Sequence, residues 1–427
     1  IANEDGTTTT DADQQVDMIN SVAKLESFVE SVEKVLARSN GESVDIDGTA
    51  TPIEVSADDF TALGFEDLLA DTSANSRLSS LQKVLSDQSE GTGSAAVVSY
   101  ADLKSVLEEA SNSFDAIVGL SSAAQDTSYD DEAARSAAIN AALAVVDADN
   151  FQSMGVDGVT DVAIGSLTAA AMSDAVKDAL ANTGNSIDGL EAIQKVVDSY
   201  TQVLSVASGD VTGASAVISD AEFADLGVDL ANRDAEEPAD IAHLLSGVIA
   251  NKAAPTSGAT TDNVDSVAEV QALADAAKRV FDNANQTSDD GGANASEADL
   301  NTLGFDAVDA DNIDAIQRVL TRTSDRNGVV DYTDFKAKVD AAVDAHTALT
   351  GVVTTAQGNA TPDLNGLDET TFADMGVDHV DAGNVAAMLD ALSNVDRAIV
   401  TAVDVQAVVD SYNVFLDLGA YDSSNSD

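Results

Sequence analysis

Apolar residues recur at steps of three and four along most of this chain, the spacing that gathers them on one face of an α-helix. The clearest series is Met18, Val22, Leu25, Val29, Val32 and Leu36. Long helices are predicted on this basis over residues 18–36, 103–120, 190–206, 267–281, 335–349 and 403–418. Medium helices are predicted over residues 78–85, 162–172, 241–249, 313–320 and 385–392, and a further Ala-rich helix over 132–146. The pattern therefore predicts an all-α fold.

A short motif lies between the long and the medium helix of each set. It reads Phe or Leu, two variable residues, Leu or Met, Gly, then Phe or Val and an acid. Its first residue and its glycine are Phe60 and Gly64, Phe151 and Gly155, Phe223 and Gly227, Leu300 and Gly304, and Phe372 and Gly376. The glycines are 91, 72, 77 and 72 residues apart, so the motif marks an internal repeat of 72 to 77 residues with one longer interval.

Each copy of the motif carries the start and stop signals of a short helix. A candidate N-cap residue precedes every copy, namely Ser56, Asp147, Ser219, Ser296 and Asp368. An acid three residues later, at Asp59, Glu222 and Asp299, indicates a capping box. Glycine directly after the last apolar residue is typical of a left-handed C-terminal cap, with the next Phe or Val in apolar contact. Each motif is therefore predicted to be a helix of one or two turns.

The fold predicted from these signals is a tandem array of small units, each with a long helix, a short Gly-capped helix and a medium helix. The expected divisions are a polar tail (1–13), repeats over 14–95, 96–183, 184–252, 253–322 and 323–396, and a partial sixth repeat with an acidic tail (397–427). The second repeat holds the extra helix. Polar segments such as residues 40–50 are expected to be linkers. The last long helix is not followed by the short and medium helices that complete the other repeats. It is therefore a natural acceptor for the first helix of another copy.

Composition narrows the possible functions. The chain has 427 residues, 76 acidic and only 19 basic side chains, and a formal net charge of -57. Nucleic acids and anionic membrane surfaces attract basic patches, so neither is an expected partner. No apolar run is long enough to span a bilayer, and the absence of Cys excludes disulfides and thiolate metal sites.

The charge also bears on location. A strongly self-repelling surface suits a medium of high ionic strength, where screening acts over a few Å. An extracellular protein with cation-neutralised carboxylates and a cytosolic protein of a salt-accumulating halophile both fit. The repeats, the Thr-rich start and the first residue Ile1 in place of Met favour the extracellular, cell-surface interpretation.

Candidate catalytic groups are scarce. His243, His346 and His379 fall at unrelated positions of different repeats. The chain contains no Gly-x-Ser-x-Gly elbow, phosphate-binding loop or dinucleotide fingerprint. We therefore expect no enzymatic activity, no catalytic residues and no organic cofactor.

One segment between two predicted helices resembles an EF-hand loop. Its oxygen ligands for Ca²⁺ would be Thr323, Asp325, Asn327, Asp331 and Asp334, with Gly328 at the sixth position. Thr323 replaces the usual first Asp, and Asp334 replaces the bidentate Glu. The interpretation we favour is a polar inter-helix turn in which Asp331 is an N-cap, and weak Ca²⁺ binding is the alternative hypothesis.

The five Gly-stopped motifs, with Asn312 and Asn384 opening the helices that follow two of them, resemble the tandem helical segments of very large secreted bacterial surface proteins, including adhesin-like ones. The resemblance implies a secreted, repetitive, non-enzymatic building block and supplies no functional residues. We expect an extracellular structural protein of a surface filament, sheath, layer or adhesin stalk. Its partners would be further copies, assembled head to tail with the help of cations, or neighbouring segments of a larger surface protein. The alternatives are a surface-displayed ligand- or glycan-binding module and an acidic halophile enzyme.

Overall fold

The computed structural model describes residues 22–46, 49–69, 74–87, 99–129, 131–161, 164, 168–182, 187, 189–210, 216–231, 238–252, 264, 266–284, 294–322, 327–358 and 360–423. The described part is mostly helical, which confirms the predicted helical class. The chain forms two compact units: Ile1–Ser205 with Ala224–Gly227 and Ala254–Val267, and Val206–Phe223 with Val228–Ala253 and Ala268–Asp427.

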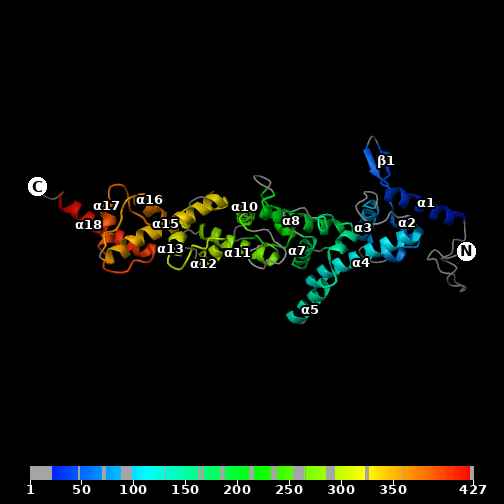
Figure 1. Ribbon diagram of the computed structural model, residues 1–427, viewed down its shortest axis with the longest axis horizontal. Coiled ribbons are helices and arrows are strands. Elements are labelled where there is room, and N and C mark those ends of the chain that lie inside the picture. Colours follow the sequence, from blue (N-terminus) through cyan, green and yellow to red (C-terminus); the bar gives the residue numbers. More distant parts are fainter. Residues whose placement is uncertain are drawn as a thin grey trace. The chain divides into compact units, whose positions relative to one another are not determined.

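Figure 1 shows the helices in chain order. The first part of the chain contains α1 (Val22–Ser39), α2 (Ala57–Ala62), the 3-10 helix η2 (Glu66–Leu69), α3 (Ala74–Asp87), α4 (Tyr100–Gln125), α5 (Glu132–Leu143), α6 (Ala148–Ser153), α7 (Ala169–Asn182) and α8 (Leu190–Ser208). There follow α9 (Asp220–Asp225), α10 (Pro238–Ile249), α11 (Val267–Ala284), α12 (Glu297–Thr302), α13 (Ile313–Thr321), α14 (Asn327–Val330), α15 (Tyr332–Gln357), α16 (Glu369–Asp374), α17 (Val385–Ser393) and α18 (Ala402–Ser423).

The long helices organise the packing within each unit. In the first unit α4 packs against α3, α5, α6 and α7, and in the second α15 packs against α10, α13, α16 and α17. The first residues of all five motifs (Phe60, Phe151, Phe223, Leu300 and Phe372) are fully buried. Burying an aromatic side chain of this size stabilises a fold by about 2–3 kcal/mol, so the short helices are fastened chiefly by these anchors.

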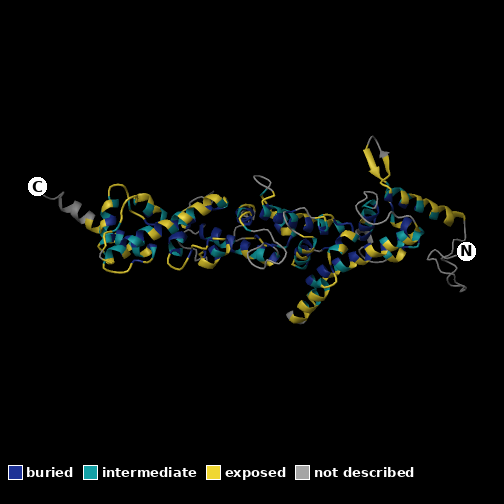
Figure 2. Ribbon diagram, viewed as in Figure 1, coloured by how far each residue is buried: buried dark blue, intermediate teal, exposed yellow. Residues whose placement is uncertain are grey.

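A β-hairpin replaces part of a predicted linker. Strands β1 (Ser43–Ile46) and β2 (Thr49–Pro52) pair antiparallel, with Ser43 opposite Pro52 and Ile46 opposite Thr49. The expectation of a plain linker over residues 40–50 was wrong here. The alternation of Val44 with polar neighbours, followed by an Asp-Gly pair, is the usual signal for a two-residue hairpin turn. Figure 2 shows the hairpin as largely exposed.

The medium helix of the second repeat lies later than predicted. The pattern placed it at residues 162–172, of which 162, 163 and 165–167 lie outside the described residues, whereas α7 runs from Ala169 to Asn182. The buried face of α7 continues beyond Met172 through Ala175, Val176, Ala179 and Leu180. The helical spacing of these residues extends past the predicted end.

Membrane insertion was not expected. Among the residues placed by the structure, no helix combines the length and the apolar character needed to cross a bilayer.

Candidate functional site

The short helices begin with the predicted capping boxes. At α2 the Asp59 amide donates to the Ser56 hydroxyl, and the Asp59 carboxylate accepts the Ser56 amide at 2.8 Å. Ser296 and Asp299 repeat this arrangement at α12, and Ser219 and Glu222 repeat it at α9. Two further boxes were not predicted: Asp147 with Asn150, and Asp368 with Thr371. In these the reciprocal acceptor is an amide or hydroxyl oxygen rather than a carboxylate.

The short helices end as the glycines predict. Gly64, Gly155, Gly227, Gly304 and Gly376 have φ values of 81°, 85°, 78°, 98° and 76°, a region that favours glycine. In every copy the amide after the glycine donates to the carbonyl of the first motif residue, at 2.8 to 3.0 Å. The glycine amide itself donates to the carbonyl three residues earlier. All five copies therefore share one C-terminal geometry, the Schellman motif.

The capping acids are also held by the long helix of their own set. The Asp59 carboxylate accepts from the Lys34 ammonium at 2.9 Å and from the Ser31 hydroxyl at 3.0 Å, both on α1. The Asp299 carboxylate accepts from Arg279 Nε of α11 at 2.6 Å. Burial by itself raises the pKa of Asp299, but the hydrogen bonds from Arg279 and Ser296 outweigh it and hold the pKa below its usual value.

The lowered pKa of Asp299 predicts a pH-dependent contribution to stability. A carboxylate of this kind stabilises the fold fully above its unfolded-state pKa of about 4 and loses that effect as the pH falls through the lower folded-state pKa. We expect Asp299→Asn to lower the free energy of unfolding by about 1–2 kcal/mol at pH 7. The difference from wild type should shrink below pH about 4.

Chemical denaturation between pH 7 and pH 3 measures this difference. The control is Asp306→Asn, an exposed acid just after the same motif, for which a change within about 0.5 kcal/mol is expected. An Asp299→Asn deficit of equal size at pH 3 and pH 7 would show that the charge of Asp299 does not matter.

A glutamine pins the end of three motifs to the following long helix. Its side-chain oxygen accepts the amide of the acid after Gly-Val at 2.7 to 3.0 Å, and its Nε2 donates to the carbonyl of the same acid at 3.2 or 3.3 Å. The same Nε2 also donates to an aspartate one turn later at 2.8 Å. The three sets are Asp157–Gln194–Asp198, Asp229–Gln271–Asp275 and Asp378–Gln406–Asp410. We call each set a glutamine clamp.

The other two motifs use an aromatic contact instead. Where Phe follows the glycine, a tyrosine begins the next long helix. Phe65 stacks on Tyr100 with the ring centroids 5.4 Å apart, and the Tyr100 hydroxyl donates to the Leu63 carbonyl at 2.9 Å. Phe305 lies 6.0 Å from Tyr332, again between ring centroids. The residue after the glycine therefore correlates with the junction that forms: Val with a glutamine clamp, and Phe with an aromatic contact.

Two medium helices each use an aspartate to bind the N-terminus of a long helix further along the chain. Asp178 of α7 accepts the amide of Val267, the first residue of α11, at 2.7 Å. Asp314 of α13 accepts the amide of Val403, at the start of α18, at 3.0 Å. An acid at a helix N-terminus is favoured by the helix dipole and satisfies an otherwise unpaired amide. Part of the Asp excess therefore serves to join helices.

Asn312 and Asn384 open α13 and α17 as predicted, but through a different bond. Asn312 Oδ1 accepts the Asp309 amide at 2.9 Å, while the Asp309 carboxylate accepts the Asn312 amide at 3.1 Å. Asp381 and Asn384 make the same pair of bonds. The side chains tie the loop to the helix start, and neither asparagine makes the side-chain bond of an ordinary N-cap.

The structure describes only part of the candidate Ca²⁺ loop. Thr323 and Asp325 lie outside the described residues, and Asn327 lies in α14. Asp331 is the N-cap of α15 and accepts the amides of Thr333 and Asp334, as the turn interpretation predicts. Within the part of the chain that the structure places, no three His, Asp or Glu side chains come together as metal ligands. Weak Ca²⁺ binding by this loop stays a prediction.

The three histidines lie in unrelated surroundings. His243 Nδ1 is 2.9 Å from the Val330 carbonyl, and His346 Nε2 is 2.6 Å from the Val400 carbonyl. The first contact joins α10 to α14, and the second joins α15 to the loop before α18. His379 has a φ of 65°, uncommon for a residue other than glycine, in the loop after the fifth motif.

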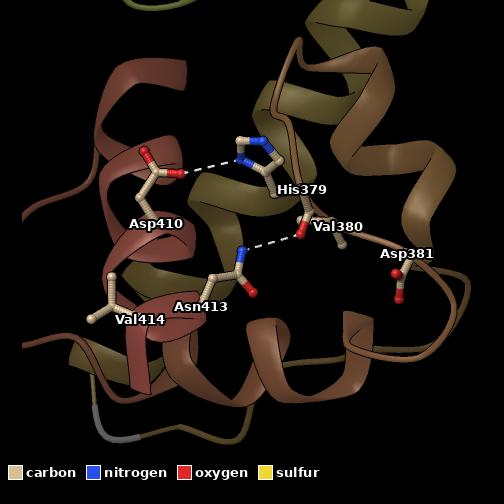
Figure 3. Close-up of a pocket in the computed structure, with 6 residues that line it drawn as sticks. All are labelled: His379, Val380, Asp381, Asp410, Asn413 and Val414. Atoms are coloured by element: carbon tan, nitrogen blue, oxygen red, sulfur yellow. Dashed lines mark hydrogen bonds and ion pairs between the residues drawn. The ribbon is translucent and has the colours of Figure 1, made fainter. Parts of the chain in front are cut away.

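His379 lies at a shallow pocket beside α18, drawn in Figure 3. Asp410 is 3.6 Å from His379 Nδ1, and Asn413 Nδ2 donates to the His379 carbonyl at 3.2 Å. Asp381 Oδ1 is occupied by the amides of Gly383 and Asn384. The polar groups that line the pocket thus hold the loop in place, and the arrangement joins no nucleophile to the histidine.

The glutamines of the clamps were missed by the pattern of apolar residues, which passes over polar positions. A signal is present: Gln-x-x-x-Asp begins at the fifth residue of α8, α11 and α18. The same position holds Lys104 in α4 and Lys336 in α15, the two helices that begin with tyrosine.

No family model matches the chain, and neither the curated proteins nor the solved structures compared with it gave a significant match.

Proposed function

We propose that this chain is a non-enzymatic structural protein of the cell surface, built as a tandem array of helical units and serving as a segment or subunit of a filament, sheath, layer or adhesin stalk. The observation that carries the proposal is the recurrence of the junctions. Glutamine clamps or Phe–Tyr contacts fasten all five Gly-stopped helices to the next long helix. Recurring contacts between nearest neighbours are the hallmark of repeat arrays.

The charge supports an extracellular setting. The clamps and caps occupy only some of the 76 acidic side chains, and a net charge of -57 opposes any association of copies. External media rich in salt or divalent cations remove that barrier by screening. The resemblance to secreted surface proteins points the same way.

The proposal predicts cation-dependent self-association of the whole chain. We expect sedimentation velocity to show a single small species at low salt with chelator, and species that grow with protein concentration when millimolar Ca²⁺ is added. Na⁺ at equal ionic strength separates general screening from specific binding. A monomer under every condition would refute self-assembly.

A ligand- or glycan-binding module is the second candidate, favoured by the pocket at His379. Strained backbone beside an open hollow is a reason to test binding. A panel of soluble glycans that binds wild type but not Asn413→Ala would support this alternative.

A further inference from the structure

The last long helix exposes a position that is buried in the four long helices α4, α8, α11 and α15. α8 and α18 share the sequence Val-Asp-Ser-Tyr, at residues 197–200 and 409–412, and both carry a glutamine clamp. Counting from the first helical residue aligns Tyr200 with Tyr412 and Val203 with Phe415. These are the eleventh and fourteenth positions of their helices.

The two positions are buried in the four long helices from α4 to α15. The residues concerned are Ala110 and Ser113 in α4, Tyr200 and Val203 in α8, Ala277 and Val280 in α11, and Ala342 and Ala345 in α15. In α18, by contrast, Phe415 at the fourteenth position is 70% exposed, while Tyr412 at the eleventh is half-buried. A phenylalanine so placed leaves apolar area in water that the same fold buries elsewhere.

The chain itself shows what covers such a face. The Tyr200 hydroxyl of α8 donates to the Val264 carbonyl at 3.0 Å, and the Ser199 hydroxyl lies 3.4 Å from the Asp225 carboxylate of α9. The cover is thus another part of the chain, made by the non-helical residue Val264 and the short helix α9. By analogy, the corresponding face of α18 suits a protein partner.

A complementary face lies on α1. Val22, Leu25, Val29 and Leu36 recur at helical spacing and are all exposed. The later long helices α4 and α15 are packed against the preceding medium helices, α3 and α13. The other side of α1 is already committed to α2 and α3, with Val35 buried between them.

Charge is also compatible with α1 as a partner for α18. α18 carries Asp404, Asp410, Asp417 and Asp422 and no basic residue. α1 carries three basic and three acidic residues, so it is neutral within a chain of net charge -57. Contact with α1 therefore adds no net like-charge repulsion to the acids of α18.

We propose that the apolar face of α18 around Phe415 docks onto the exposed apolar face of α1 of a second copy. This inference rests on the proposed function, because it names the two faces that would make the copies self-assemble. The contact joins different surfaces, so each copy keeps one free end and the chain of copies can continue.

Mixing two variants tests the docking. Phe415→Glu leaves α1 intact, and Val29→Glu leaves α18 intact. Each variant alone should remain monomeric by sedimentation velocity in Ca²⁺, whereas an equimolar mixture should form a 1:1 dimer that grows no further. Val145→Glu removes an exposed apolar residue elsewhere and adds the same charge, so it should assemble like wild type. Circular dichroism confirms that the variants keep their helices.

Each of the other outcomes would overturn the docking of α18 onto α1. Assembly of Phe415→Glu alone would overturn the docking while leaving the proposed function intact. A dimer formed by Val29→Glu alone would indicate contact between two α18 helices and overturn it as well. Failure of wild type to assemble would refute both self-assembly and the docking, and would leave the α18 face to a following segment of a longer chain.

Discussion

Replacing Phe372 by alanine is expected to lower the free energy of unfolding of the second unit by about 3–5 kcal/mol, the usual cost of emptying a buried aromatic site. Phe372 is fully buried and is the anchor of α16, which packs on α15. Its carbonyl also accepts the Val377 amide that closes the helix. Loss of the ring therefore loosens the short helix and its stop together.

Native-state hydrogen exchange measures this effect in the second unit without assuming that the whole chain unfolds at once. The matched control is Phe415→Ala, the same substitution at an exposed site, for which a change within about 0.5 kcal/mol is expected at low protein concentration. A Phe372→Ala loss below about 1 kcal/mol would contradict the assigned role of the motif as a core anchor.

Gly376→Ala should cost about 2–4 kcal/mol, from two separate causes. The left-handed φ of 76° disfavours any side chain by about 1–2 kcal/mol. An added Cβ would also lie 2.6 Å from Arg318 Cβ and 3.4 Å from the Ala315 carbonyl oxygen, and such overpacking costs about 1–3 kcal/mol. The motif therefore requires glycine for its backbone and for the close approach of α13.

Substitutions at two other glycines separate the backbone cost from the overpacking cost. Gly366 has a φ of 82° and open space around it, so Gly366→Ala should show the backbone cost alone. Gly351 lies inside α15 with open space, so Gly351→Ala should raise stability by about 0.5–1 kcal/mol. Thermal denaturation ranks the three. Equal effects of Gly376→Ala and Gly366→Ala would show that α13 yields to the added methyl group.

The signals that the sequence carries in single residues were read correctly. Ser56 and Ser296 begin helices because a hydroxyl can accept a free amide, and Gly64 or Gly376 ends them because only glycine adopts the required φ cheaply. Such effects act within a few residues, so a pattern along the chain is enough to predict them.

Contacts between distant segments could not be predicted in the same way. Gln406 and Asp378 are 28 residues apart and meet only once the helices have packed. The Gln-x-x-x-Asp spacing marks Gln406 in the sequence, but it does not identify Asp378 as the partner. Asp178 and Val267 are further apart still along the chain. The β-hairpin was missed for another reason: an expectation of helices made an alternating segment look like a polar linker.

The pocket at His379 shows how little of the candidate site can be predicted from the sequence. The sequence marks the histidine but not its backbone strain, and the structure shows the surrounding polar groups engaged with the loop. The recurring junctions, visible only when the helices are placed, carry more of the functional argument than any single polar cluster.

Head-to-tail assembly of this chain can be seen by negative-stain electron microscopy of the whole protein, with Ca²⁺ and with chelator at low salt. We expect unbranched polymers of one repeating subunit in Ca²⁺ and single particles with chelator. Single particles in both conditions, at concentrations well above micromolar, would contradict it.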